Sequence, residues 1–455
     1  MVYVRAMKTE FLLDYPTILA NQPRPVHFAI QFVADKVGAV RPKPAAFCVV
    51  LDRSGSMNGA PLAHAKAATK VAVRNLLPED QFGLVIFDQE ARTVIPLQPA
   101  KNKQSFYTII DQIAAGGSTN LTGGWMLGRD ELGKTGAGTN RRLLLLSDGQ
   151  LNFGIKEPVA VRQIVVNGLE QAEVRTSCLG FGPTYNEDLM ADLAKATNGQ
   201  FYHADSPESL PGIFAAELEG LQNLSVQNLR VRVKALDFCE EFTAMGEYPS
   251  VTLPDGRREF ALGDLVSEEE RIVCFGVKVY ALPLINGQAA FDLKGELLLG
   301  VEVLWDELSL QGLCSRTLTQ EVRVKATQDP AVVVVNRVVV PWVSQQMAGA
   351  VVAGAIKLMD GGKEAEAQAW LDKNILDLQQ YGDDCKEARA QLQDMKKSIT
   401  LWSAVKRKEA MLGSYRSRKM SSREIWEQQQ KSQGGNPPPP GSNPPAAGGG
   451  NPPTV

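Results

Sequence analysis

Two uninterrupted apolar runs constrain the fold of this chain more than any other feature. The runs are AAFCVVL at 45–51 and LLLL at 143–146, and neither alternates apolar with polar residues. A strand that is apolar on both faces needs cover on both faces, which is typical of a central strand in a parallel sheet. Amphipathic stretches lie between such runs, as crossover helices require. Residues 45–221 are therefore predicted to form an α/β doubly wound, Rossmann-like domain.

The same pattern places the individual elements of this domain. Strands are expected at 45–51, 82–87, 92–96, 143–147, 174–180 and 201–203. Helices are expected at 61–77, 105–114, 121–132, 158–171, 186–196 and 206–221. If the strand order is 3-2-1-4-5-6, the first and fourth strands are neighbours, and the ligand crevice lies at their carboxyl ends.

The sequence on either side of this segment has a different texture. Runs such as LRVRVKAL and TLTQEVRVKA in residues 222–342 alternate apolar and polar side chains, which predicts antiparallel strands. Residues 1–44 show a similar pattern, so we expect the α/β domain to be inserted in one discontinuous antiparallel β-sandwich. A helical bundle or hairpin is predicted for 343–413. Residues 414–455 contain a basic segment and a Pro/Gly-rich tail that is predicted to be disordered.

Charge and hydropathy narrow the classes of function. The chain has 48 Lys+Arg and 51 Asp+Glu, a formal net charge of -3, so no global field attracts nucleic acid or an anionic membrane. No apolar run is long enough to predict a membrane span, and the N-terminal residues do not resemble a secretory signal. A cytoplasmic protein is expected. The basic run at 396–423 is interpreted as a solvated helix face, with a nucleic-acid contact as the alternative.

The six cysteines and the histidines provide little evidence for a metal site. The cysteines lie singly and form no CxxC pair, so we interpret them as buried thiols, with disulfides or zinc binding as the alternatives. The histidines are far apart in the sequence and suggest no ligand set. A site for a soft metal is therefore not expected.

Polar residues follow both central strands at the point where each strand ends. The first is followed by DRSGSM, with Asp52, Ser54 and Ser56, and the fourth by Asp148. A glycine-rich loop, GGSTN at 116–120, can bring a further hydroxyl to the same edge. Two nearby carboxylates repel each other unless a proton or a cation lies between them. Carboxylate and hydroxyl oxygens suit Mg²⁺, with Mn²⁺ or Ca²⁺ as alternatives.

These residues resemble the von Willebrand factor type A domain. The metal-ion-dependent adhesion site of that family uses an Asp-x-Ser-x-Ser turn, a loop threonine and a later aspartate. Those positions are filled here by Asp52, Ser54, Ser56, Thr119 and Asp148. The runs FCVVLDRSGSM, GLVIFDQEARTVIPL, GGSTNLTGG and LLLLSDGQLNFG resemble its bacterial and inter-alpha-trypsin-inhibitor-like branch. The resemblance implies that the two serines bind the metal directly, the threonine directly or through water, and the aspartates mainly through water.

The resemblance also implies a function. It predicts a metal-dependent protein–protein interaction module, in which an acidic residue of a partner completes the coordination of the metal. A cytosolic scaffold, or an adaptor of a MoxR-type AAA+ ATPase, is the expected setting, and a secreted or surface adhesion protein is the alternative. No GxSxG elbow is present and no histidine is placed to activate the serines, so a metal-dependent hydrolase is the lower alternative and no enzymatic activity is expected.

Two residues near the motif are open to a second interpretation. Ser118 would replace Thr119 as the loop ligand if the loop were shifted by one residue. Trp125 is interpreted as helix core, and a place on the recognition face is the alternative. Only the fold can decide between these alternatives.

Overall fold

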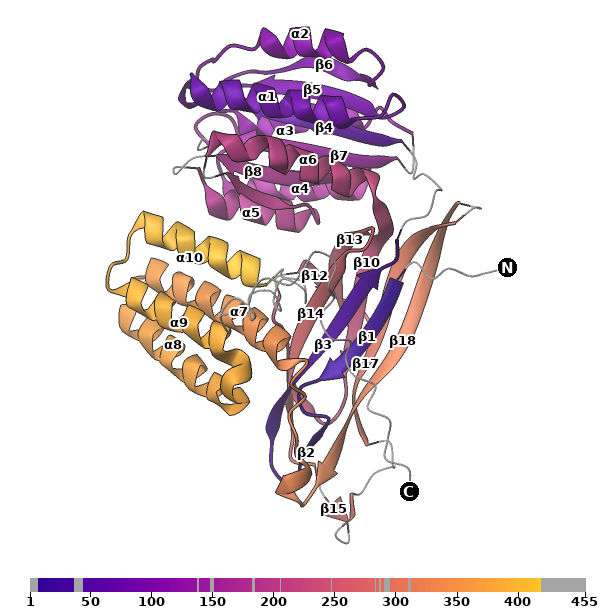
Figure 1. Ribbon diagram of the computed structural model, residues 1–455, viewed down its shortest axis with the longest axis vertical. Coiled ribbons are helices and arrows are strands. Elements are labelled where there is room, and N and C mark those ends of the chain that lie inside the picture. Colours follow the sequence, from indigo (N-terminus) through magenta and orange to yellow (C-terminus); the bar gives the residue numbers. More distant parts are fainter. Residues whose placement is uncertain are drawn as a thin grey trace, which may run out of the picture.

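Three regions make up the protein, which we describe from a computed structural model (Figure 1). An α/β domain stacks on one end of a β-sandwich, and a helical region lies beside the sandwich and under the α/β domain. The structure describes residues 7–36, 44–136, 139–147, 151–181, 185–204, 206–246, 248–282, 284–285, 288–289, 295–309 and 312–418.

The α/β domain has the predicted strand order. Its sheet runs β6-β5-β4-β7-β8-β9, with β6 antiparallel at one edge and the other neighbours parallel. The strands are β4 (Ala45–Asp52), β5 (Gln81–Phe87), β6 (Ala91–Pro99), β7 (Asn140–Ser147), β8 (Val174–Phe181) and β9 (Phe201–Ala204). The helices are η1 (Gly55–Met57), α1 (Ala60–Asn75), α2 (Lys103–Asp111), α3 (Leu121–Leu132), α4 (Pro158–Ala172), α5 (Glu187–Ala196), η2 (Pro207–Ser209) and α6 (Leu210–Gln222).

Strand β4 shows why the apolar runs require cover on both faces. All its residues are buried. Phe47, Val49 and Leu51 belong to the apolar core on one side of the sheet, and Cys48 and Val50 to the core on the other side. Successive side chains of a strand point to opposite faces, so a continuous apolar run supplies both cores at once.

Helix α3 packs closely against the sheet because it carries glycines where it meets the strands. A Cβ on Gly124 would lie 2.6 Å from the ring of Phe87, so only glycine fits there. Trp125 is fully buried and donates its indole N–H to Thr176 Oγ1 at 2.9 Å. The interpretation of Trp125 as core is confirmed, and it does not lie on a recognition face.

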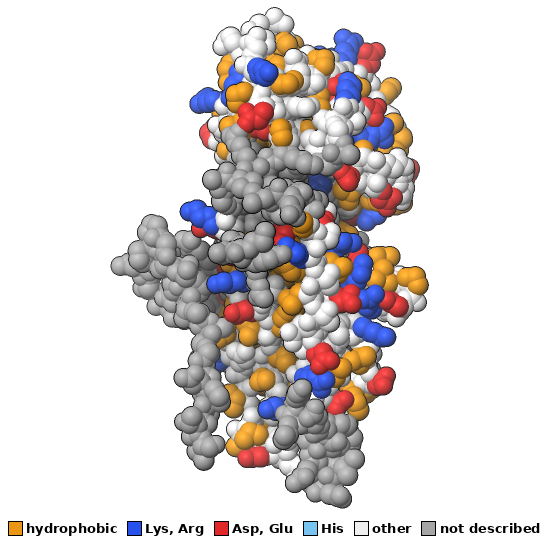
Figure 2. Space-filling view, turned by 90° about the vertical axis from the view of Figure 1, so that its right-hand side faces the viewer, with side chains coloured by type: hydrophobic (Ala, Val, Ile, Leu, Met, Phe, Trp, Pro, Cys, Tyr) orange, Lys and Arg blue, Asp and Glu red, His pale blue; other side chains and the backbone are white. Residues whose placement is uncertain are grey.

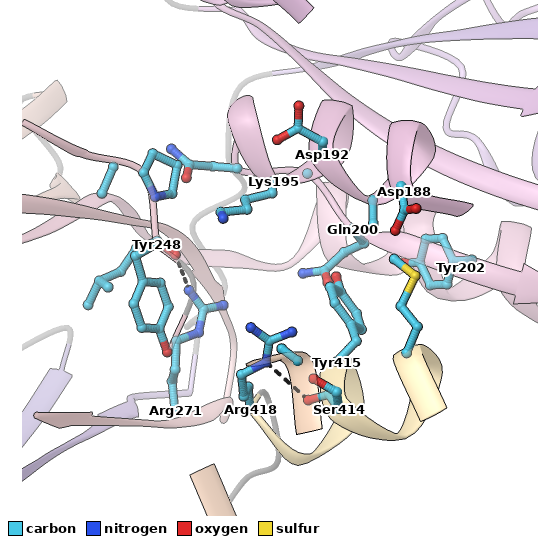
Figure 3. A pocket seen from close by; sticks show the side chains of 18 of the residues that line it. Asp188, Asp192, Lys195, Gln200, Tyr202, Tyr248, Arg271, Ser414, Tyr415 and Arg418 are labelled. Carbon is cyan, nitrogen blue, oxygen red and sulfur yellow. Dashed lines mark hydrogen bonds between the residues drawn. The ribbon is translucent and has the colours of Figure 1, made fainter. Parts of the chain in front are cut away.

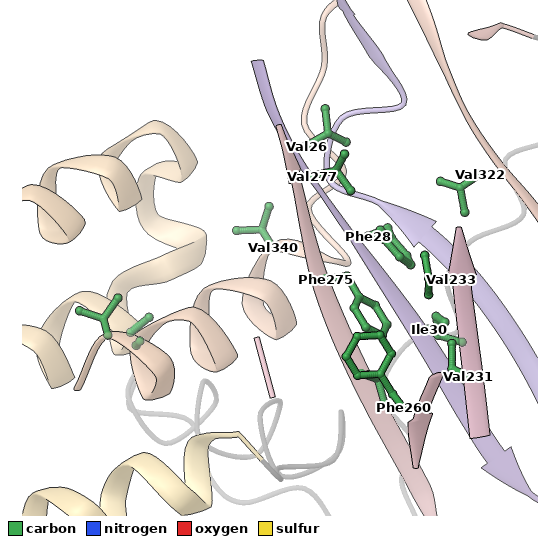
Figure 4. Packing of buried hydrophobic residues seen from close by; sticks show 14 of the residues in the cluster. Val26, Phe28, Ile30, Val231, Val233, Phe260, Phe275, Val277, Val322 and Val340 are labelled. Atoms are coloured by element: carbon green, nitrogen blue, oxygen red, sulfur yellow. The ribbon is translucent and has the colours of Figure 1, made fainter. Parts of the chain in front are cut away.

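The sandwich includes the N-terminal strands, which confirms that the α/β domain is an insertion. One sheet has the order β1-β3-β14-β11, and β3 pairs with β14 across the inserted domain. Phe28, Phe260 and Phe275 pack together between the sheets (Figure 4). The strands are β1 (Met7–Leu13), β2 (Thr17–Leu19), β3 (Arg24–Ala34), β10 (Leu224–Ala235), β11 (Cys239–Ala244), β12 (Ser250–Thr252), β13 (Arg258–Val266), β14 (Glu270–Val279), β17 (Glu296–Ser309) and β18 (Gly312–Thr327).

The second sheet of the sandwich has one feature that the sequence pattern does not predict. Its order is β12-β13-β10-β17-β18-β2, and the short strand β2 pairs with β18 in parallel. A separate hairpin joins β15 (Leu284–Ile285) to β16 (Gln288–Ala289). The antiparallel character is otherwise as expected.

The helical region begins and ends outside the predicted 343–413. It contains η3 (Pro330–Val332), α7 (Val340–Asp360), α8 (Glu364–Leu378), η4 (Gln379–Cys385), α9 (Lys386–Ile399) and α10 (Ala404–Ser417). Pro341 lies in the first turn of α7, where its missing N–H costs nothing, so the helix begins before the predicted boundary. Of the predicted basic segment and Pro/Gly-rich tail at 414–455, residues 419–455 lie outside the described residues.

The surface charges and the cysteines are arranged as the near-neutral net charge and the cysteine spacing predict. In the part of the chain that the structure describes, no helix is long and apolar enough to cross a membrane. Lys/Arg and Asp/Glu side chains are interspersed on the face shown in Figure 2. The six cysteines are free, and burial raises the pKa of the Cys48, Cys178 and Cys274 thiols. These three thiols are therefore poor nucleophiles.

Candidate metal centre

The candidate site lies at the carboxyl end of β4, far from the sandwich. The chain enters the domain at the start of β4 and leaves it after α6. Seven residue steps along β4 separate its first residue from Asp52, a distance of about 23 Å at the usual rise of a strand. The insertion therefore holds the site away from the connections to the rest of the protein.

A buried carboxylate organises the turn that follows β4. Asp52 is fully buried, and its Oδ1 accepts a hydrogen bond from Ser54 N at 2.8 Å. Its Oδ2 accepts one from Ser147 Oγ at 2.6 Å, and Ser147 is the last residue of the neighbouring strand β7. The two serine hydroxyls of the turn, Ser54 Oγ and Ser56 Oγ, lie 3.1 Å apart. A buried carboxylate thus holds the turn, and the turn places two hydroxyls side by side.

The glycine-rich loop is tied to this turn by backbone hydrogen bonds. Gly55 N donates to Gly117 O at 2.8 Å, and Gly116 N donates to Arg53 O at 2.6 Å. Two residues further along, Thr119 is 2% exposed. Its neighbour Ser118 is exposed to solvent. Thr119 is thus buried within the loop, whereas Ser118 lies at its surface.

An ion pair that the motif does not include supports both the turn and the loop. Asp88, just after β5, is buried and accepts hydrogen bonds from the Arg53 guanidinium and, at 2.9 Å, from Glu90 N. Arg53 Nη1 also donates to Ala114 O at 3.2 Å, at the start of the loop. A Cβ on Gly116 would lie 2.0 Å from Asp88 Oδ2, so this approach requires glycine.

Asp88 and Ser147 are the residues at this site that sequence reasoning missed. Asp88 ends the run GLVIFD as Asp52 ends the run FCVVLD, and this shared strand-end position was the available signal. Ser147 ends the strand β7 that neighbours β4. Its hydrogen bond to Asp52 depends on the strand order, which local sequence does not show.

The donor set of the described residues fits a hard divalent cation. Two ligand oxygens that occupy adjacent positions of an octahedral Mg²⁺ site lie about 3.0 Å apart, and the serine hydroxyls lie 3.1 Å apart. Among the described residues, no group of three or more His, Cys, Asp or Glu side chains is placed to hold a metal ion. Asp148, the second predicted aspartate, lies outside the described residues.

A cavity lies where the three regions meet (Figure 3). Its volume is about 480 Å³, which is within the range of ligand pockets. Tyr202, Tyr248 and Tyr415 line it, and Lys195 and Arg418 also face it. The carboxylates that line it are held in ion pairs: Asp188 and Asp360 with Arg407, Asp192 with Arg162, Glu217 with Arg142, Asp264 with Arg175 and Glu269 with Arg271. These pairs favour a structural junction over a catalytic pocket.

Helix α10 forms much of that junction and changes the interpretation of the basic run. Arg407 contacts Glu187 at 3.0 Å, Asp188 at 2.6 Å and Asp360 at 2.7 Å. The hydrogen bonds to Asp360 and Asp188 raise the pKa of Arg407. Tyr415 OH accepts a hydrogen bond from Phe201 N at 3.2 Å. Part of the run is therefore a contact between the helical region and the α/β domain, and not a solvated face.

Comparisons with known proteins point to one domain family. The von Willebrand factor type A domain model matches residues 48–216. An uncharacterised protein of Synechocystis sp. is 25% identical over 253 residues, which cover 54% of this chain and 59% of that protein. Human inter-alpha-trypsin inhibitor heavy chain H4 is 29% identical over 196 residues, which cover 40% of this chain and 20% of that protein. This chain therefore matches only part of each relative's length.

Two solved structures share the fold over almost the whole chain. A von Willebrand factor type A protein from Catenulispora acidiphila superposes with a TM-score of 0.65 at 17% identity, covering 92% of this chain and 98% of that one. The ArnB paralog VWA2 from Sulfolobus acidocaldarius has a TM-score of 0.57 at 14% identity, covering 91% and 98%. At these identities the similarity shows the fold alone.

Proposed function

Residues 48–216 are a von Willebrand factor type A domain, and from this premise we propose that the protein is a metal-dependent protein–protein interaction module. The observation that carries the proposal is the pair of hydroxyls, Ser54 and Ser56, that lie 3.1 Å apart on a turn held by the buried carboxylate of Asp52. The buried Thr119 lies on a loop that is hydrogen-bonded to the same turn. Together with Asp148, these residues would hold Mg²⁺, and Mn²⁺ or Ca²⁺ are the alternatives.

Each residue has a separate task in this proposal. Ser54 and Ser56 would hold the cation through neutral hydroxyls, and Thr119 would add a third. Asp52 fixes the turn through Ser54 N and Ser147 Oγ, so that its carboxylate can hold and orient water beside the cation. A bound divalent cation supplies a strong positive charge that attracts an anionic group. An Asp or Glu side chain of a partner protein is the ligand that fits this chemistry.

A hydrolase is the lower candidate, because the three histidines of the chain are engaged elsewhere. His27 Nδ1 bonds to Asp14 Oδ2 at 2.8 Å in the sandwich. His64 Nδ1 bonds to Ala60 O at 2.8 Å on its own helix, and His203 Nδ1 to Tyr185 OH at 2.7 Å. A serine nucleophile needs a base within hydrogen-bonding reach. These contacts of the histidines therefore support binding over acyl transfer.

The cytosol is the compartment that we propose. Free cysteines, several of them buried, are usual in a reducing compartment, whereas secreted proteins pair them. A surface or secreted adhesion protein is the alternative. For the partner, family analogy suggests a MoxR-type AAA+ ATPase, for which the protein would act as a scaffold or adaptor.

Metal titration tests the proposed site directly. We expect Mg²⁺ to bind the full-length protein in calorimetry and to raise its melting temperature, because a ligand that binds only the folded state stabilises it. Thr119→Ala and Ser54→Ala should abolish both effects. Ser118→Ala is the matched control, since it removes the neighbouring hydroxyl of the same loop, which the family motif does not use. Equal Mg²⁺ binding by all three variants would refute the assignment.

Capture of a partner tests the function. The candidate ATPase should bind the immobilised protein in Mg²⁺ and elute with EDTA, and Ser54→Ala should not retain it. Retention that is unaffected by both EDTA and the substitution would refute metal-mediated binding. Turnover of generic phosphate or ester substrates in Mg²⁺ that is lost in Asp52→Ala would favour the hydrolase instead.

A further inference from the structure

The loop that precedes α4 is attached to the candidate metal centre by its backbone. Phe153 N donates to Thr119 O at 3.1 Å, and Thr122 Oγ1 donates to Ile155 O at 3.2 Å. Between these anchors, Gly154 has a φ of 75°, and a Cβ there would lie 2.4 Å from Asn120 Oδ1. Residues 153–155 therefore contact the segment from Thr119 to Thr122, where the glycine-rich loop ends and α3 begins.

The side chains of this loop face solvent although they are apolar. Phe153 is 50% exposed and Ile155 is 41% exposed. Val159, in the first turn of α4, is 82% exposed, and Met126, one helical turn after Thr122, is 38% exposed. We call these four residues the apolar patch. Single exposed apolar residues are ordinary, but a group of them next to a binding site marks an interaction surface.

The anchoring explains why this exposure is informative. A mobile loop with a phenylalanine at its tip can bury the ring by moving. Here the backbone of Phe153 is held by Thr119 and the glycine beside it leaves no room against Asn120, so the backbone that carries the exposed ring is held at a fixed position. A preorganised aromatic side chain is typical of the anchor of a protein interface.

We propose that the apolar patch and the metal centre together recognise one extended peptide segment of a partner, in which an acidic residue lies within a few positions of a bulky apolar residue. The proposal rests on the proposed function, since the acidic residue is the group that the cation would bind. The backbones of Phe153 and Thr119 are in direct contact, so the two subsites are only a few residues apart along an extended chain. The apolar residue packs on Phe153 and supplies the specificity that a single carboxylate lacks.

A displayed peptide library tests this with the full-length protein as bait. The peptides carry one fixed central aspartate and random flanks, and selection is done in Mg²⁺ and in EDTA. We expect Mg²⁺-dependent enrichment of Leu, Ile, Phe or Met near the aspartate. Phe153→Ser should remove the apolar preference, and Phe153→Leu should largely restore it. Leu401→Ser, which changes a 74% exposed leucine on the helical region, is the matched control.

A synthetic peptide from the selection gives the magnitude. Fluorescence anisotropy should show binding about tenfold or more weaker in Phe153→Ser and unchanged in Leu401→Ser. Two results would overturn the inference and leave the proposed function standing. One is Mg²⁺-dependent selection of aspartate peptides that shows no apolar preference. The other is an apolar preference that remains in Phe153→Ser although the melting temperature of this variant is unchanged. If no Mg²⁺-dependent peptide that needs Ser54 is selected, the proposed function fails and the inference fails with it.

Discussion

Replacing Asp88 by asparagine tests whether the loop that carries Thr119 is held in place by a buried charge. Asp88 is 1% exposed and accepts hydrogen bonds from the Arg53 guanidinium and from Glu90 N. Asparagine keeps the shape and one acceptor oxygen. Its NH₂ group must then face one of the two donors, so the buried site loses a negative charge and one hydrogen bond.

The structure sets the size of the expected effect. A hydrogen bond to a charged group contributes about 1.5–3 kcal/mol. The Arg53 side chain is 20% exposed, so water partly compensates the guanidinium, and we expect a loss of about 2 kcal/mol. For a domain of this size that corresponds to about 4–8 °C in melting temperature. Since Arg53 and Asp88 position residues around the cation site, Mg²⁺ affinity should also fall by about 10- to 100-fold.

Calorimetry of the full-length protein measures both quantities. Asp111→Asn is the matched control, because Asp111 is 59% exposed and pairs with Lys70 on the surface, where an ion pair contributes about 0–1 kcal/mol. If Asp88→Asn melted within a degree of Asp111→Asn and bound Mg²⁺ like the unchanged protein, the buried ion pair would have no organising role.

Three further predictions use other parts of the structure. Gly168→Ala would place a Cβ 2.4 Å from the buried tryptophan ring of α3 and should lower the melting temperature, whereas Gly136→Ala, with nothing within 4 Å, should not. Burial would raise the pKa of Glu131, but hydrogen bonds from a backbone N–H, a lysine and a threonine outweigh it and leave the pKa below 4.5. The unchanged protein should therefore be more stable than Glu131→Gln, and this difference in unfolding free energy should be fully present above pH 4.5 and decrease as the pH falls through the lowered pKa. A difference that grows in acid would contradict this. Arg407→Ala should speed hydrogen exchange in α10 and α5 because their ion pairs are lost, and Lys363→Ala, which removes an exposed pair, should leave both helices unchanged.

The α/β domain could be predicted because its signals are local. Strand β4 is apolar at every position before Asp52, and a continuous apolar run is compatible with few places other than the centre of a covered sheet. The turn motif follows that strand directly, so the position of Ser54 and Ser56 at the sheet edge followed from the strand assignment. The alternation of β3 and β10 likewise predicted the sandwich and the insertion.

The supporting contacts could not be predicted because they join distant parts of the chain. The basic run appeared solvated because its acidic partners lie elsewhere: Arg407 pairs with Glu187 and Asp188, about 220 residues away. No pattern within the run shows those partners.

The sequence by itself thus determined the fold class and the motif at the end of β4, because apolar periodicity and turn chemistry act over a few neighbouring residues. Only the tertiary structure decided that Asp88 and Ser147 support the motif, that Thr119 is buried while Ser118 is exposed, and that Phe153 is fixed beside it. Each of these depends on distances between segments far apart in the chain, which packing sets and local pattern does not record.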